Sequence, residues 1–143
     1  MNILVTGGNG FIGFALVKRL LNDGHAVRCL VHKSKHLLEG LGPELVRGSL
    51  SEPESLASAS EGVDLVYHLA GSGRAGDWGK RKWFFEVNAQ GTRNILDAAI
   101  SNKVGRFVMT SSLAVHRFSG HINADEQVPA DQEKYAYGAS KAA

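Results

Sequence analysis

The segment "NILVTGGNGFIG", residues 2–13, decides how the rest of the chain is interpreted. Its first half is a short apolar run, typical of a buried strand, that stops at two glycines. The stretch that follows, residues 11–24, predicts a helix that ends at Gly24. Its apolar residues at helical spacing are Phe11, Ala15, Leu16 and Leu20. A glycine turn lets the backbone approach a phosphate at the positive helix N-terminus, so the segment predicts a dinucleotide-binding loop rather than an ordinary tight turn.

The alternation of strand-like and helical stretches continues along the chain. Further strands are predicted at 26–31, 44–48, 63–70 and 106–112. Helices are predicted between them, at 34–41, at 51–60 with Pro53 in the first turn, and at 83–102. Strands separated by helices imply right-handed βαβ units and a parallel sheet covered on both faces. The predicted fold class is therefore α/β with a doubly wound parallel sheet.

Composition limits the possible functions. The chain has 143 residues, 43% of them hydrophobic and 21% charged, as in one globular domain. A net charge of +2 argues against a nucleic-acid binder, and the basic cluster at 80–82 is interpreted as a solvated helix start. Cys29 is the single cysteine, so it predicts a buried core residue and a reducing, cytoplasmic setting. No apolar run approaches the ~18 residues of a membrane span, and the scattered histidines predict no metal site.

Five motifs occur in a fixed order over nearly the whole chain. They are "TGGNGFIG" (6–13), "HLAG" (68–71), "VNAQGT" (87–92), "TSS" (110–112) and "YGASK" (137–141). Together they resemble the extended branch of the short-chain dehydrogenases/reductases, which includes NAD-dependent epimerase/dehydratases and dihydroflavonol-reductase-like enzymes. The resemblance implies a Rossmann-like fold, a nicotinamide dinucleotide cofactor and hydride exchange with a secondary alcohol or carbonyl.

One of the two tyrosines near residue 137 is singled out by spacing. A free tyrosine is a poor base at neutral pH, and a lysine held beside it favours the phenolate. Residues at i and i+4 share a helix face, which pairs Tyr137 with Lys141 and Tyr135 with Ala139. The resemblance then implies that Tyr137 is the general acid/base and that Lys141 tunes it and holds the nicotinamide ribose.

The resemblance also implies roles for other polar residues. Ser112 matches the serine that orients and polarises the substrate oxygen, and Asn88 matches an asparagine that helps to order a proton-relay water. Taken singly, each has an ordinary alternative, such as a serine at a strand end or an asparagine on a helix. The residues expected to contact the cofactor are Gly7, Gly10, Phe11, Ile12, Gly13, His32, Lys33, Ser49, Leu50, Leu69, Ala70, Gly71, Tyr137 and Lys141.

The choice of dinucleotide depends on the end of the second strand. An acidic residue there would bind the ribose 2′-hydroxyl of NAD and repel a 2′-phosphate. The chain offers "VHKSK" (31–35), with His32 and Lys33 and no acid, so NADP(H) is somewhat favoured over NAD(H). At 48–50 it has "GSL" where the family usually has GDL, so Ser49 replaces the aspartate that contacts adenine.

Three readings of the whole chain stay open. The first is a reductase or hydroxysteroid dehydrogenase-like enzyme, the second a nucleotide-sugar epimerase or dehydratase with bound NAD, and the third a non-enzymatic NADP-sensing regulator. The resemblance also implies that residues 1–143 are an incomplete cofactor-binding domain, without the later strands and the substrate-binding part, and inactive alone. A complete protein is expected to form a homodimer through the helix at 83–99 and the helix that begins near Tyr137.

Overall fold

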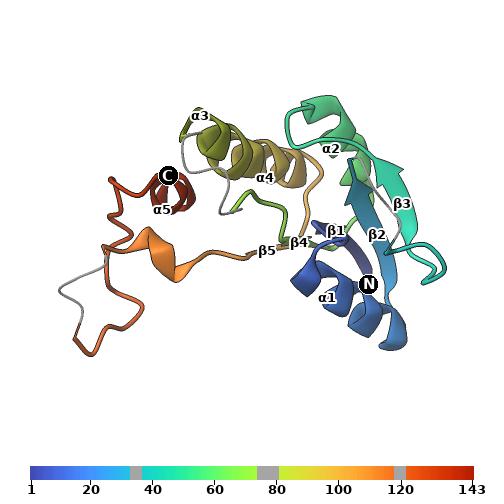
Figure 1. Cartoon of the computed structure of the whole chain (residues 1–143). Coiled ribbons are helices and arrows are strands. Elements are labelled where there is room, and N and C mark those ends of the chain that lie inside the picture. The colour runs from blue at the N-terminus through green and yellow to red at the C-terminus, as the bar shows by residue number, and fades with distance from the viewer. Residues whose placement is uncertain (33–36, 74–80, 118–121) are drawn as a thin grey trace.

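A computed structural model of the chain describes residues 1–32, 37–73, 81–117 and 122–143. Five strands form one sheet, and helices follow β1, β3, β4 and β5 (Figure 1). The strands are β1 (Asn2–Thr6), β2 (Ala26–Val31), β3 (Glu44–Arg47), β4 (Leu65–His68) and β5 (Arg106–Met109). The helices are α1 (Phe11–Asn22), α2 (Pro53–Ala59), α3 (Arg81–Phe84), the π-helical η2 (Phe85–Gln90), α4 (Gly91–Ser101), the 3₁₀ turn η3 (Leu113–Val115) and α5 (Ala136–Ala142). The predicted α/β fold with a parallel sheet is confirmed.

The sheet has the strand order β3-β2-β1-β4-β5, and every neighbouring pair is parallel. β1 lies at the centre, where Ile3 pairs with Val27 on one side and Leu65 on the other. The order reverses direction at β1 and β4, which is the point where open α/β sheets bind ligands beyond the carboxyl ends of their strands. β5 is an edge strand.

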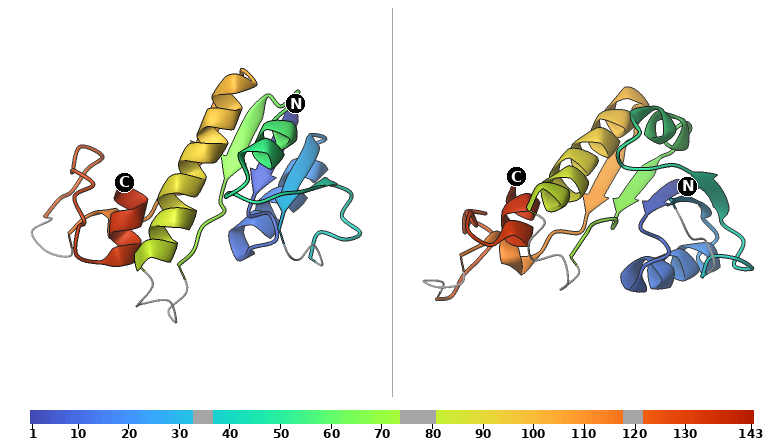
Figure 2. Two further views of the ribbon diagram at one scale, coloured as in Figure 1. Left: turned by 90° about the horizontal axis from the view of Figure 1, so that it is seen from above. Right: turned by 45° about the horizontal axis from the view of Figure 1, so that its top comes forward.

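Helices cover both faces of the sheet. α1 lies on one face, and α2 and α4 lie on the other (Figures 1 and 2). Because strand side chains alternate between faces, each face has its own core. Val5, Val17 and Cys29 lie in the core under α1, and Leu4, Val66 and Ile95 lie in the core under α2 and α4. Burial raises the pKa of the Cys29 thiol to about 12, so this side chain is an inert core residue, as predicted.

Two stretches differ from the sequence prediction. The predicted helix at 34–41 is wrong for its described part, because residues 37–41 form turns and Gly40 and Gly42 take positive φ angles of 83° and 93°. Such angles favour glycine and interrupt a helix. In α1 the buried residues are Gly13, Val17 and Leu20, whereas Phe11 is 97% exposed. Phe11 is the first residue of α1, after the turn that follows β1, and does not belong to the core.

The long helix predicted at 83–102 is present as a continuous run over 81–101, but its middle section is π-helical. π-helical turns are rare and often lie at functional sites. Here the turn includes Asn88, a buried polar residue. Within the described ranges, no helix has the length and apolar composition to cross a membrane.

Candidate active site

The glycine turn after β1 is fixed by close backbone contacts. Gly7 has a φ of 74°, and a Cβ atom there would lie 2.6 Å from the amide nitrogen of Ala70. A Cβ atom on Gly13 would overlap the carbonyl oxygen of Gly7. The amide of Gly10 donates to that carbonyl at 2.9 Å. Side chains at Gly7 and Gly13 would therefore push the loop away from the sheet.

The N-terminus of α1 is suited to an anion. Gly10 caps the helix without a side-chain hydrogen bond, and the first turn holds no acidic residue. Its amide groups are therefore not neutralised by a carboxylate of that turn, and the helix dipole adds positive potential. Phe11 and Ile12 are 97% and 59% exposed beside this end. These features fit a dinucleotide pyrophosphate on the predicted loop.

The adenosine end of the predicted site lies at the carboxyl ends of β2 and β3. His32 follows β2 and is exposed, while Lys33 lies outside the described residues. The Ser49 hydroxyl is 2.8 Å from the Ser51 hydroxyl, an interaction the sequence did not predict. Leu50 is fixed by the neighbouring helix, because Asn94 donates to its carbonyl at 2.7 Å.

The turn Leu69–Gly71 after β4 lies directly against the glycine turn. The amide of Leu69 donates to the Thr6 carbonyl at 3.1 Å, and the amide of Ala70 donates to the Thr6 hydroxyl at 3.3 Å. Gly71 is exposed and approaches Asn88, since a Cβ atom there would lie 3.1 Å from the Asn88 Oδ1 atom. The turn therefore connects the predicted cofactor loop with the π-helical segment.

Asn88 holds two segments together. Its Oδ1 atom accepts from the Ser72 amide at 2.8 Å, and its Nδ2 group donates to the Ser72 carbonyl at 2.9 Å and to the Ser140 hydroxyl at 2.9 Å. The side chain thus joins the stretch after β4 to α5. With 3% of its surface exposed, it also lies in the interior.

Ser112 and Tyr137 come from segments that pack on each other. Ser112 precedes η3, and its hydroxyl accepts from the Ala114 amide at 3.2 Å. A Cβ atom on Gly138 would overlap the carbonyl oxygen of Ala114, so α5 packs on η3 with almost no space between the backbones. The glycine after Tyr137 therefore brings the serine segment and the tyrosine helix together.

The Tyr137 ring is half-buried among aromatic and glycine neighbours. It contacts Phe84 and Tyr135 edge to face, with both ring centroids 6.0 Å away. A Cβ atom on Gly73 would lie 3.2 Å from the ring, so the stretch after β4 reaches the tyrosine directly. The predicted helical placement of Tyr137 and Lys141 is confirmed by α5.

Lys141 reaches back to the end of β5. Its ammonium group donates to the Thr110 carbonyl at 2.8 Å. Burial lowers the pKa of Lys141, because a charged ammonium loses hydration there. The lysine charge therefore lies at the carboxyl end of the sheet, where the predicted site is located.

Several residues that hold this site were not assigned a role by the sequence. Gln132 is 7% exposed, and its Oε1 atom accepts from the amides of Lys134 and Tyr135 at 3.2 Å just before α5. Ser140 bonds Asn88 across 52 positions of sequence. His68 and Thr92 belong to the motifs HLAG and VNAQGT, which predicted no function for these two residues. The motif letters could have indicated His68 and Thr92, but Gln132 has no local signal.

The part of the chain that the structure describes contains no group of three or more His, Cys, Asp or Glu side chains that could hold a metal ion.

A family model, that of the NAD dependent epimerase/dehydratase family, matches residues 3–143. The chain therefore belongs to this family. Curated relatives include the 2-alkyl-3-oxoalkanoate reductase of Stenotrophomonas maltophilia, 35% identical over 99% of this chain and 44% of that protein. The 3-beta-hydroxysteroid dehydrogenase of Mycolicibacterium neoaurum is 35% identical over 89% of this chain and 36% of its own length. The chain thus spans less than half of the length of these relatives.

Solved structures give the same assignment. A short-chain dehydrogenase/reductase superfamily protein from Agrobacterium tumefaciens with bound NAD is 36% identical, with a TM-score of 0.81 over 99% of this chain and 42% of that chain. The UDP-glucose 4-epimerase of Thermus thermophilus in complex with NAD is 29% identical, with a TM-score of 0.86 over 99% of this chain and 48% of that chain. Both similar structures contain NAD, and both reductases and epimerases occur among the relatives.

Proposed function

We propose that the chain is the cofactor-binding part of an NAD(P)-dependent oxidoreductase that exchanges hydride with a secondary alcohol or carbonyl. The observation that carries this proposal is the meeting of three segments at the carboxyl end of the sheet. The Ser112 segment packs on α5 through Gly138, and the Tyr137 ring contacts Gly73 on the stretch after β4. Tyr137, proposed as the acid/base, and the Ser112 segment therefore lie at the same end of the strands as the glycine turn, which supports the proposal.

Each of these residues has a role that its chemistry allows. A nicotinamide, when bound, supplies or accepts the hydride. Tyr137 would donate or accept the proton at the substrate oxygen, and Ser112 would polarise that oxygen through its hydroxyl. The Lys141 ammonium would favour the phenolate form of the tyrosine by its charge and would hold the nicotinamide ribose. Asn88 would order a water on the proton path from its position between the Ser72 backbone and Ser140.

The glycine turn would hold the pyrophosphate. Gly7 and Gly13 allow the backbone to come close, and the uncapped N-terminus of α1 presents its amide groups. Ser49 and Leu50 would contact the adenine, and His32 with Lys33 would favour the 2′-phosphate of NADP(H) over the free hydroxyl of NAD(H). A cytoplasmic location, suggested by the single cysteine, belongs to the same proposal.

The alternative enzyme is an epimerase or dehydratase that uses the same Ser112, Tyr137 and Lys141 with tightly bound NAD. The segment "GSGRAGDWGKRKW" lacks the serine- and proline-bearing pattern associated with nucleotide-sugar epimerases, which favours a reductase for smaller or apolar alcohols. A non-enzymatic sensor is the third candidate, and the presence of all three residues argues against it.

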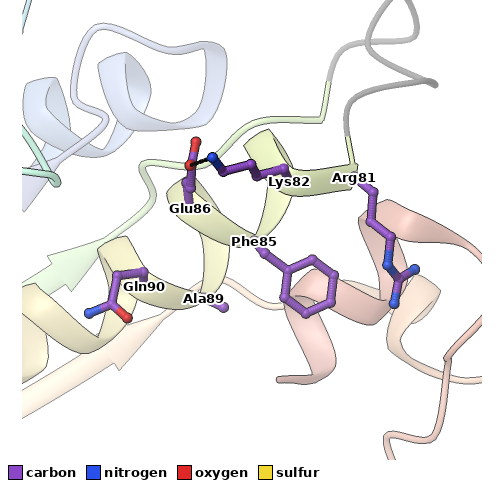
Figure 3. Close-up of a pocket in the computed structure, with 6 residues that line it drawn as sticks. All are labelled: Arg81, Lys82, Phe85, Glu86, Ala89 and Gln90. Atoms are coloured by element: carbon purple, nitrogen blue, oxygen red, sulfur yellow. Dashed lines mark ion pairs between the residues drawn. The ribbon is translucent and has the colours of Figure 1, made fainter.

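We also propose that the complete protein adds a substrate-binding part and forms a homodimer. The face of α3 and η2 carries a pocket of about 770 Å³ beside α5, lined by Arg81, Lys82, Phe85, Glu86, Ala89 and Gln90 (Figure 3). The Arg81 guanidinium lies 4.9 Å from the centre of the Phe85 ring, and Lys82 pairs with Glu86 at 3.6 Å. In sedimentation, Phe85→Asp should weaken a dimer of the complete protein, whereas Ile122→Asp, at an exposed loop position, should not. A complete protein that sediments only as a monomer would contradict the homodimer.

The test of the function uses the complete protein and the 143-residue chain side by side. Each is incubated with NADPH or NADH and a panel of ketones and aldehydes, with oxidation of the cofactor followed by absorbance, and separately with NAD and a panel of sugar nucleotides. Net oxidation by the complete protein supports a reductase, and interconversion of sugar nucleotides without net oxidation supports an epimerase. Tyr137-dependent turnover by the 143-residue chain would show that the proposed further part is dispensable.

A further inference from the structure

His68 lies in the interior at the end of β4, between the turn Leu69–Gly71, which we call the cofactor turn because it contacts the predicted cofactor loop, and the π-helical segment η2. It is 1% exposed and packs at 6.0 Å from the ring of Phe107. Its Nδ1 atom is 2.7 Å from the hydroxyl of Thr6 on β1, and its Nε2 atom is 3.0 Å from the hydroxyl of Thr92 on α4. A single ring therefore joins two strands and a helix.

The hydrogen at Thr92 fixes the direction of these bonds. A hydroxyl has one hydrogen to donate, and Thr92 is 2.6 Å from the carbonyl oxygen of Asn88, which can only accept. Since its hydrogen is used there, the Thr92 oxygen must accept from His68. The Nε2 atom of His68 therefore carries the proton.

The role of the other ring nitrogen, Nδ1, follows from the charge state of His68. Burial, with a smaller contribution from the Lys141 charge, lowers the pKa of His68 to about 4, so the ring is neutral at pH 7. With Nε2 protonated, Nδ1 has a free lone pair and accepts from the Thr6 hydroxyl. The Thr6 oxygen in turn accepts from the amide of Ala70 at 3.3 Å. Every hydrogen bond in this chain is thus donated in the same direction, from the Ala70 amide through Thr6, His68 and Thr92 to the Asn88 carbonyl.

Both ends of this hydrogen-bond chain belong to the candidate active site. Ala70 lies in the turn that contacts the glycine loop at Gly7. Asn88 lies in the π-helical segment, where its side chain holds Ser72 and Ser140. A shift of the Asn88 backbone would therefore be transmitted both to α5 and, through the ring, to the cofactor turn.

We propose that His68 is a positioning residue, which as a neutral ring protonated on Nε2 fixes the cofactor turn at Ala70 relative to the Asn88 segment. This inference rests on the proposed function for its consequence, but the hydrogen-bond chain itself can be tested without any activity. Removal of the Thr92 hydroxyl should loosen the other end of this hydrogen-bond chain, at Ala70. Loss of packing around Thr92 alone would not have that effect.

The first measurement is nitrogen NMR of protein labelled with ¹⁵N in its histidines. A His68→Gln sample assigns the His68 signals among the six histidines. The expected result at pH 7 is a neutral ring with a proton on Nε2 and none on Nδ1. A proton on Nδ1, or on both nitrogens, would overturn the proposal.

The second measurement compares two variants of Thr92. Thr92→Val keeps the shape and loses the hydroxyl, and Thr92→Ser keeps the hydroxyl and loses a methyl group. Thr92→Val should speed hydrogen exchange at the Ala70 amide about 5-fold, as expected for the loss of one hydrogen bond, and leave the Leu4 amide at the centre of β1 unchanged. Thr92→Ser should resemble the unmodified protein. Equal exchange at Ala70 in both variants would overturn the proposal.

Calorimetric titration with NADP⁺ and NAD⁺ separates this proposal from the proposed function. If either dinucleotide binds the unmodified protein, Thr92→Val should weaken that binding about 5-fold and Thr92→Ser should not. Equal affinity in both variants would overturn the positioning role. If neither binds the complete protein, the proposed function fails, and the NMR and exchange results still decide whether the hydrogen-bond chain exists.

Discussion

The glycine turn after β1 and the helix that carries Tyr137 are held in different ways. The turn is fixed by backbone atoms in close contact, with Gly7 against Ala70 and Gly13 against Gly7 itself. α5 has such a contact at Gly138 and is also held by side-chain bonds, such as those between Asn88 and Ser140 and between Lys141 and the Thr110 carbonyl.

The two regions also differ in where they lie relative to the sheet. The turn extends from β1, which has a strand on each side, whereas α5 packs on η3, α3 and η2 and reaches the end of the edge strand β5 through the Lys141 side chain. Backbone contacts leave little room for adjustment, while side-chain bonds can be removed one at a time. Substitutions in the turn should therefore affect binding as a whole, and substitutions in the catalytic region should lower turnover more than binding.

The largest expected effect of this kind is at Tyr137. In the complete protein, Tyr137→Phe should lower kcat by about 10²- to 10⁴-fold, because only the oxygen that transfers the proton is lost. Affinity for the dinucleotide should stay nearly unchanged in calorimetric titration. Tyr135→Phe is the matched control and should have little effect. Greater damage from the Tyr135 change would show that the spacing argument for Tyr137 is wrong.

Glycine substitutions in the two regions should have the next largest effects. Gly13→Ala should lower the free energy of unfolding by about 3 kcal/mol and abolish dinucleotide binding, since its Cβ would overlap the Gly7 carbonyl. Gly138→Ala, whose Cβ would overlap the Ala114 carbonyl, should reduce turnover and weaken binding less than Gly13→Ala does. Gly105→Ala meets only the Asp64 carbonyl at 3.5 Å and serves as the control. Urea unfolding and calorimetry measure both effects, and equal loss of binding in Gly13→Ala and Gly138→Ala would remove the distinction between the two regions.

Local sequence patterns predicted the sheet well. Each strand is a short apolar run between turns, and the glycine turn after β1 and the helical spacing of Tyr137 and Lys141 are visible in the letters alone. The stretch 37–41 was wrongly predicted as helix because its composition suits one, while the backbone of Gly40 takes a positive φ. Composition does not report that angle.

Contacts between distant residues could not be predicted. Asn88 was expected in the site from its motif, but its bond to Ser140 joins positions 52 apart and depends on how α5 packs. The burial of Gln132 likewise depends on the close approach of α5 and η3. Phe11 matched a helical apolar pattern and is nevertheless exposed, because it is the first residue of α1, after the turn that follows β1.

A pH titration tests whether His68 is a buried, neutral ring in the folded chain. Its pKa is lowered from 6.5 to about 4 in the folded chain, so the unfolded chain binds the proton first as the pH falls. The stabilisation from the neutral ring is therefore complete above pH 6.5 and is lost between pH 6.5 and about 4. This loss corresponds to at most about 3 kcal/mol. In urea unfolding, His68→Gln should show a shallower fall of stability over this range, and an equal fall would contradict a buried neutral ring.

The smallest expected effect concerns the Lys33 side chain, which follows β2, and the choice between NADP(H) and NAD(H). "VHKSK" offers no carboxylate after β2, so the chain should bind NADP(H) more tightly than NAD(H). Lys33→Glu should reverse that order, because a carboxylate there accepts from the ribose hydroxyl and repels a 2′-phosphate; a change of about 10-fold corresponds to ~1.4 kcal/mol, within the range of one charged hydrogen bond. Lys103→Glu changes the net charge by the same amount at the opposite end of the strands, beyond α4, and should leave the ratio of the two affinities unchanged. Calorimetric titration of both dinucleotides against all three proteins measures these ratios. A clear preference of the unmodified chain for NAD(H) would contradict the role proposed for the charge after β2.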